Sequence, residues 1–378
     1  MRRNLLGGPL LALLSTAVAL LLVEVGVRLT GLYVDEDLKR IRQEERLYYI
    51  RDPLLGWRGR PGAVYEVRGT TTGTVVHNNA LGFRDREFGA KRPGTTRIAV
   101  LGDSFIWGYG ATSVESRFSD RLERLLQLEG HNVEVYNFGI SGWGTDQEYL
   151  AYRHVLSRLD PDLVILGYYT NDAIDNINRV GKPYYVLAGG ELRLMNVPVP
   201  EATGSETVAY TPSLSERIKI FLAHRLYTYK ILRNTLKRSD LLAGWLVRLG
   251  VLEDELEGHE PAYIEALARA LLTRTCGAVR ADGTQLLVLW IPDLYEVRSG
   301  RLSAMMRMTA SIKERLVRTD LACPSLDLAP IFRAAMHATR KAFYQQYDGR
   351  HWDDDGNRLV AEEVGKFLRA RGLPPYGR

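Results

Sequence analysis

The chain has 378 residues, of which 46% are hydrophobic and 25% are charged, and its formal net charge is +5. This length allows one to three domains with a large buried core, in a composition ordinary for a globular protein. The net charge is small for this size, and the sequence lacks zinc-knuckle, helix-turn-helix and RNA-binding signatures, so we expect no nucleic-acid partner. It also has no P-loop and no His-Glu-x-x-His pattern, so we expect no metal or cofactor.

The N-terminus differs from this soluble composition. The run from Leu5 to Val23 contains no charged residue and follows Arg2 and Arg3. Such a run is long enough to span a bilayer, and the arginines favour a cytoplasmic N-terminus. We therefore predict that residues 1–33 form a single-pass anchor in the inner (cytoplasmic) membrane, with the rest extracytoplasmic or periplasmic. A cleaved signal peptide ending near Ala19 is the alternative.

Residues 34–96 are predicted to be a lead-in segment with short strands. The stretch from Glu36 to Tyr49 is charged and predicts a helix. The stretch from Asp52 to Glu87 is rich in Gly, Thr and Arg and contains short Val pairs, which favours short strands over a complete domain.

Residues 97–378 alternate between strand and helix patterns. The predicted strands are Ile98–Leu101, Val133–Tyr136, Leu163–Leu166, Leu286–Ile291 and Leu326–Leu328. The predicted helices are Arg117–Leu128, Asp146–Leu159, Pro261–Val279, Leu302–Val317 and Asp355–Arg371. This alternation predicts an α/β domain whose mostly parallel sheet lies between two layers of helices.

An insertion at about residues 178–260 interrupts this alternation. It begins with a predicted hairpin, Tyr184–Leu187 and Leu192–Met195, that turns at Gly189 and Gly190. A basic amphipathic stretch follows from Leu214 to about Leu249. Two interpretations stay open for it: a helical cap with a solvated basic face, or a helix that lies on an anionic membrane or covers the site.

The two cysteines, Cys276 and Cys323, lie near the end of a predicted helix and just before a predicted strand. They have no metal-ligand spacing. A disulfide and two unpaired buried thiols both remain open.

The candidate nucleophile is Ser104. The apolar run Ile98–Leu101 ends in Gly102-Asp103, which breaks the strand, so Ser104 follows the end of a predicted parallel strand, where open sheets bind their ligands. Because a serine alone is a weak nucleophile, it requires a base and donors for an oxyanion.

Later segments provide residues of both kinds. His351 has the chemistry of a general base, and Asp348 stands three residues before it, where it is suited to orient the imidazole. Gly142 lies in a glycine-rich stretch after one predicted strand, and Asn171 follows another with an amide suited to hold an oxyanion. Each of these features alone is more typical of a turn or a helix cap.

Taken together, these four blocks resemble the SGNH (GDSL-type) hydrolases over about residue 97 to the C-terminus, apart from the insertion. The resemblance implies a flavodoxin-like three-layer sandwich. It implies a triad of nucleophile Ser104, base His351 and orienting Asp348. It also implies an oxyanion hole formed by the N–H groups of Ser104 and Gly142 and the side chain of Asn171.

Two further features bear on this resemblance. Tyr169 stands where the third block usually has glycine, and this departure is expected either to narrow the acyl pocket or to shift Asn171. The lead-in stretch Asn79–Asp85 is similar to that of membrane-anchored bacterial relatives.

The function expected is that of a membrane-anchored extracytoplasmic serine esterase, acting on O-acyl (acetyl) esters of envelope glycans. One alternative is an O-acyltransferase that uses the same acyl-enzyme. The other is a non-catalytic polysaccharide-binding protein that keeps the fold, since a fold alone does not fix function.

Overall fold

The computed structural model describes residues 15, 18–19, 21–26, 48–67, 74–200, 259–298, 304–345 and 350–377. The chain divides into two compact units. Met1–Glu44 and Ala202–Glu253 form one unit, which is described only at residues 15, 18–19 and 21–26. Glu45–Glu201 and Asp254–Arg378 form the other, which contains all the elements discussed below.

The structure does not support the predicted membrane anchor. Residues 21–26 are helical, but no helix within the described ranges is long and apolar enough to cross a bilayer. This finding contradicts the single-pass inner-membrane localisation that the apolar run Leu5 to Val23 led us to expect. The basic stretch from Leu214 to Leu249 lies outside the described residues.

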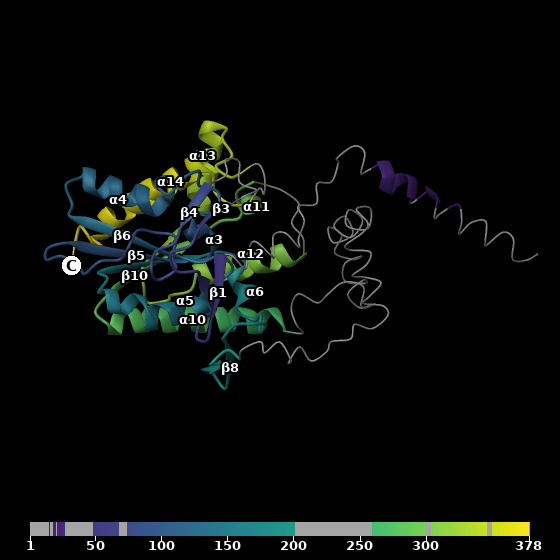
Figure 1. The fold of residues 1–378 in the computed structure, drawn as a ribbon, viewed down its shortest axis with the longest axis horizontal. Coiled ribbons are helices and arrows are strands. Elements are labelled where there is room, and N and C mark those ends of the chain that lie inside the picture. The colour runs from purple at the N-terminus through teal and green to yellow at the C-terminus, as the bar shows by residue number, and fades with distance from the viewer. Residues whose placement is uncertain are drawn as a thin grey trace, which may run out of the picture. The chain divides into compact units, whose positions relative to one another are not determined.

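The larger unit is built on a five-stranded parallel sheet with the order β11-β10-β7-β5-β6 (Figure 1). Its strands are β5 (Thr96–Gly102), β6 (Val133–Gly139), β7 (Leu163–Tyr168), β10 (Gln285–Trp290) and β11 (Ser325–Asp327). With these five strands renumbered 1 to 5 along the chain, the order is 5-4-3-1-2, which is that of flavodoxin-like folds. In such folds strand 2 lies on one side of strand 1, and strands 3 to 5 follow on its other side. The expected α/β fold with a mostly parallel sheet is confirmed.

Helices cover both faces of this sheet (Figure 1). The helices of the larger unit are α3 (Ser104–Trp107), α4 (Phe118–Leu128), α5 (Thr145–His154), η1 (Leu156–Leu159), α6 (Asp172–Asp175), α10 (Pro261–Ala281), α11 (Leu294–Val297), α12 (Ala304–Val317), α13 (Ala329–Thr339) and α14 (Asp354–Arg371). Alternate strand residues serve the two layers: Ala99 and Leu101 pack in the core with α5 and α10, whereas Ile98 and Val100 pack in the core with α4 and α14.

Two antiparallel hairpins form in the lead-in segment. β1 (Tyr49–Asp52) pairs with β2 (Gly56–Gly59), and β3 (Val64–Val67) pairs with β4 (Thr74–His77). Tyr49 therefore begins a strand, although the charged stretch before it predicted a helix. The inserted hairpin is β8 (Tyr184–Ala188) and β9 (Glu191–Met195), and its turn residues Gly189 and Gly190 both have positive φ, as the sequence predicts.

The predicted helices and strands of the sheet domain lie close to the observed ones, with several differences. The helix expected over Asp146–Leu159 leaves α-helical geometry at Val155 and continues as the short 3-10 helix η1. The short helices α6 and α11 were not predicted. α13 was also missed, although Pro330 in its first turn is a recognised helix-start signal.

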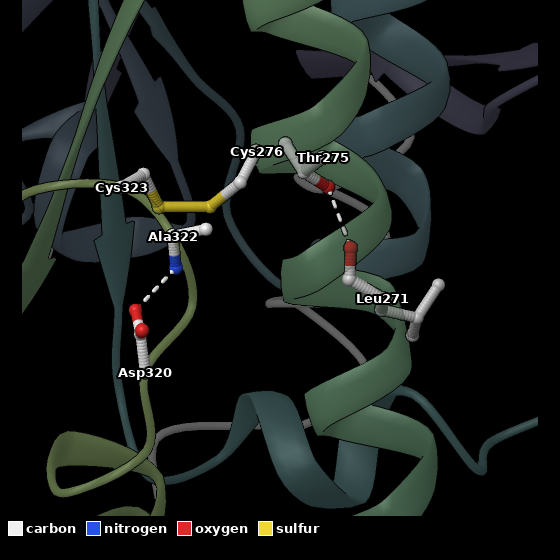
Figure 2. Close-up of a disulfide and its surroundings, with 6 residues drawn as sticks. All are labelled: Leu271, Thr275, Cys276, Asp320, Ala322 and Cys323. Atoms are coloured by element: carbon white, nitrogen blue, oxygen red, sulfur yellow. Dashed lines mark hydrogen bonds between the residues drawn. A yellow bond between two sulfur atoms is a disulfide. The ribbon is translucent and has the colours of Figure 1, made fainter.

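The two cysteines form a disulfide (Figure 2). Cys276 lies on α10, and Cys323 lies in the loop before the edge strand β11. Asp320 accepts a hydrogen bond from the Ala322 N–H at 2.8 Å and so shapes the turn that brings Cys323 to the helix. The bridge ties the edge of the sheet to the helix layer beside it, and it resolves the alternative of two free thiols.

Candidate active site

Ser104 is the first residue of the short helix α3, directly after β5. Asp103 is 1% exposed and caps this helix by accepting the Phe105 N–H at 2.9 Å. The turn is tight: a Cβ at Gly102 would lie 2.3 Å from Ile106, and one at Gly139 would lie 2.1 Å from the Trp107 nitrogen. Glycine at these two strand ends therefore lets α3 fold back onto the sheet and present Ser104 at its edge.

His351 lies within hydrogen-bond distance of Ser104, although the two residues are far apart in the sequence. The Ser104 Oγ is 2.8 Å from the His351 Nε2. The His351 carbonyl accepts the Gln345 N–H at 2.8 Å, and its neighbour Trp352 forms a bridge with Tyr344, so the segment is held by backbone contacts. This geometry allows the imidazole to take a proton from the serine hydroxyl.

Aromatic rings surround this histidine. Phe105 lies 4.8 Å and Tyr109 lies 4.7 Å from the His351 ring, measured between centroids. Phe105 in turn contacts Trp352 and Tyr169 at 4.9 and 4.5 Å. We call this group the aromatic flank of Ser104: Phe105, Tyr109, Tyr169, His351 and Trp352. Asp348, the expected orienting carboxylate, lies outside the described residues.

Gly142 and Asn171 follow the two strands that flank β5. β6 pairs with β5 so that Gly139 stands opposite Gly102, and β7 pairs with β5 on its other side. The carboxyl ends of parallel strands meet at one edge, so Gly142 and Asn171 follow strands on either side of the one that ends before Ser104. Gly142 is exposed and has a φ of +79°, a conformation that favours glycine.

The amide of Asn171 has a defined partner on the next turn. Its Nδ2 donates to the Asp175 Oδ2 at 2.8 Å, across one turn of helix. One N–H of this amide is therefore committed to Asp175, and the Asn171 side chain also hydrogen-bonds Asp103. Burial raises the pKa of Asp175 to about 7, and Lys182 opposes this rise.

Asp175, itself partly exposed, adjoins four buried carboxyl residues. We call the five together the acidic flank of Ser104: Asp103, Asp146, Glu148, Asp172 and Asp175. Lys182, itself buried, pairs with Asp146 at 2.8 Å and donates to the Asp175 carbonyl at 2.8 Å. Burial raises the pKa of Glu148 well above its usual value, and negative Asp103 raises it further. Burial also raises the pKa of Asp172 well above its usual value.

Tyr169, the departure from the family pattern, is 3% exposed. Its ring packs against Phe105, and its hydroxyl donates to the Asp293 carboxylate. Its N–H donates to the Asp172 Oδ2 at 2.7 Å, which fixes the backbone two residues before Asn171. Tyr169 therefore connects the two flanks, a role that the sequence did not predict.

Two further residues near the site were missed. Asp175 stands four residues after Asn171, a spacing that places two side chains on one helix face and could have revealed it. Trp57 lies in the lead-in segment and donates its indole N–H to the Ser141 carbonyl at 3.2 Å. No local pattern connects residues so far apart in the chain, so sequence reasoning had no signal for Trp57.

A cavity also lies away from the Ser104–His351 pair. A cavity of about 570 Å³ lies at the opposite edge of the sheet, where Thr96, Asp162 and Gln285 line it at the starts of strands. Ligands of open parallel sheets bind at the carboxyl ends instead, and the Ser104–His351 pair lies there. We therefore place the candidate site by its chemistry.

Comparisons with known proteins bear on the family of the chain. No curated protein matches the chain. An acetyl xylan esterase, AlAXEase, is 15% identical over 72% of this chain and 99% of its own, with a TM-score of 0.40. A lipase/acylhydrolase from Enterococcus faecalis is 13% identical over 73% of this chain and 96% of its own, with a TM-score of 0.39. These structural likenesses are too weak to carry an argument about activity.

The family comparison is more specific. Residues 100–212, which include Ser104, Gly142 and Asn171, match the GDSL-like Lipase/Acylhydrolase family. The sequence resemblance had pointed to the same family from its separate motif blocks. This part of the chain is therefore similar to GDSL-like hydrolases of the SGNH type, and the match supports an ester hydrolase.

Proposed function

We propose that Ser104 and His351 hydrolyse esters through an acyl-enzyme. The observation that carries this proposal is the 2.8 Å distance between the Ser104 Oγ and the His351 Nε2. His351 takes the hydroxyl proton while Oγ attacks the acyl carbon, and it then passes that proton to the leaving alcohol. A water attacks the acyl-enzyme next, with His351 again taking a proton and returning it to the Ser104 Oγ.

The other residues of the proposal act on charge that develops in these steps. Asp348 is proposed to orient His351 and to stabilise its imidazolium form. The N–H groups of Ser104 and Gly142 and the side-chain amide of Asn171 are proposed to donate hydrogen bonds to the oxyanion. Asp175 supports the last of these, because its carboxylate holds one Asn171 N–H.

The substrate we propose is a short O-acyl ester, such as acetyl, on a glycan. Tyr109 and Trp57 support this, since both are partly exposed near the candidate site. Partly exposed aromatic rings offer apolar surface beside a polar tip, which suits one face of a sugar ring.

The test is the hydrolysis of p-nitrophenyl acetate and of an acetylated polysaccharide by the full chain and by Ser104→Ala. We expect Ser104→Ala to lose measurable activity on both substrates. Ser157→Ala, which removes a hydroxyl from η1, is the matched control and should retain full activity. Ester cleavage that persists in Ser104→Ala would overturn the proposal.

A further inference from the structure

The lead-in hairpin and the loop after β6 are joined by a reciprocal pair of hydrogen bonds. The Trp57 indole N–H donates to the Ser141 carbonyl at 3.2 Å. The Trp143 indole N–H donates back to the Trp57 carbonyl at 3.0 Å. Each tryptophan side chain thus donates to a backbone carbonyl of the other segment. The hairpin and the loop therefore hold each other in place.

The first of these bonds acts on the peptide unit that contains the Gly142 N–H. The Ser141 carbonyl and the Gly142 N–H belong to one planar peptide group, and in a trans peptide they point in opposite directions. A donor fixed on the carbonyl therefore fixes the direction of the N–H. It also polarises the group, which makes the N–H a stronger donor.

Gly142 needs such a constraint. It is exposed, its φ is +79°, and glycine has more backbone freedom than any other residue. A Cβ built on Gly142 would meet the Trp57 ring at 3.6 Å, so the ring edge also lies beside this residue.

Trp57 is itself held in place. Asp52 accepts the N–H groups of Leu54 and Leu55 at 2.9 Å each, which fixes the turn between β1 and β2. Gln147, fully buried on α5, donates to the Leu55 carbonyl at 2.7 Å and ties this turn to the sheet domain. A site residue is positioned precisely enough for catalysis only when its supporting contacts are rigid, and these contacts provide that rigidity.

We propose that Trp57 is a positioning residue, which aims the Gly142 N–H at the oxyanion. This inference rests on the proposed function, and it makes the lead-in segment a part of the active site. Removing an oxyanion donor outright costs about 10²- to 10³-fold in kcat. A misdirected donor is expected to cost less, so we expect about a 10-fold loss of kcat when the Trp57 N–H is removed.

The test compares Trp57→Phe with wild type and with Arg51→Ala in the full chain. Trp57→Phe keeps an aromatic ring and loses the N–H. Arg51→Ala perturbs the same hairpin, where Arg51 donates to the Val199 carbonyl, without touching the loop. We measure kcat and KM for p-nitrophenyl acetate, the rate of labelling by a fluorophosphonate, and the melting temperature.

The inference predicts that Trp57→Phe lowers kcat and the labelling rate about 10-fold, with KM within about twofold. Arg51→Ala should leave both rates unchanged. Wild-type kcat and labelling in Trp57→Phe, with Ser104→Ala inactive, would overturn this inference and leave the proposed function intact. Activity that persists in Ser104→Ala would overturn both.

If Trp57→Phe shows a large fall in melting temperature, the variant has a folding defect. The inference is then tested with a replacement closer in shape to tryptophan. The residue 3-benzothienylalanine at position 57 keeps the bicyclic ring and has sulfur in place of the N–H. A 10-fold loss of kcat in that protein supports the inference, and an unchanged kcat overturns it.

Discussion

The two flanks of Ser104 hold their functional residues by different means. On the aromatic flank, Phe105 and Tyr109 pack against His351, and the contacts are between rings. On the acidic flank, Asp175 holds the amide of Asn171, and buried carboxyl groups lie behind it. The Phe105 ring carries no charge at any pH, whereas burial raises the pKa of Asp175 on the acidic flank to about 7. The placement of the base should therefore tolerate pH better than the placement of the oxyanion donor.

The largest predicted loss of kcat comes from removing the base on the aromatic flank. We predict that His351→Ala lowers kcat by about 10⁶-fold and Asp348→Ala by about 10⁴-fold, because an orienting carboxylate contributes less than the base it serves. The assay is p-nitrophenyl acetate hydrolysis, with the exposed His337→Ala as control. Near-normal activity in His351→Ala would show that the aromatic flank holds a structural histidine only.

The acidic flank should show an intermediate effect. We predict that Asn171→Ala lowers kcat by about 10²- to 10³-fold through loss of an oxyanion donor. Asp175→Asn should lower it by about 10-fold, as expected for weakening one charge-assisted hydrogen bond. In an Asn171→Ala background, Asp175→Asn should have no further effect, since the two residues act through one contact. Additive losses would instead give Asp175 a role of its own.

The smallest effect is on stability and concerns Glu148. Both of its carboxylate oxygens are buried and have no hydrogen-bond partner within the described part of the chain. Because burial raises its pKa, the folded protein keeps a proton that the unfolded chain releases near the usual value. The resulting stability is complete below the usual pKa of glutamate and is lost as pH rises through the raised pKa.

Glu148→Gln removes this titration. We expect a melting temperature about 2–4 °C above wild type at pH 8, with a shallower dependence on pH between 5 and 8. Glu129→Gln is the control of opposite sign, since the hydrogen bond from Arg369 lowers the pKa of Glu129. A pH dependence unchanged in Glu148→Gln would mean that Glu148 does not titrate in this range.

Much of the fold could be predicted because its signals are local. The run Leu163–Leu166 is apolar throughout, as a strand covered on both faces must be, and it lies within β7. The position of the candidate nucleophile at a strand end could also be predicted from a local signal. Gly102 and Asp103 break the strand directly after the apolar run, and Ser104 follows them.

The features of the site that were not predicted depend on contacts between segments that are far apart in the sequence. Trp57 acts on Ser141 across the interface of the lead-in hairpin with the sheet domain, and no pattern around Trp57 shows that. Tyr169 was expected either to narrow the acyl pocket or to shift Asn171, and that stays a prediction. The bond from its hydroxyl to Asp293, which follows a different strand, was not predicted. The apolar run Leu5 to Val23 satisfied a length rule, but no spanning helix occurs among the residues described.

The central claim, that Ser104 is the nucleophile and His351 its base, is tested most directly by covalent labelling. The full chain is treated with a fluorophosphonate, digested, and analysed by mass spectrometry to find the modified residue. We expect a single phosphonylated residue, Ser104, with labelling abolished in His351→Ala. Labelling of another residue, or equal labelling of Ser104 in His351→Ala, would contradict it.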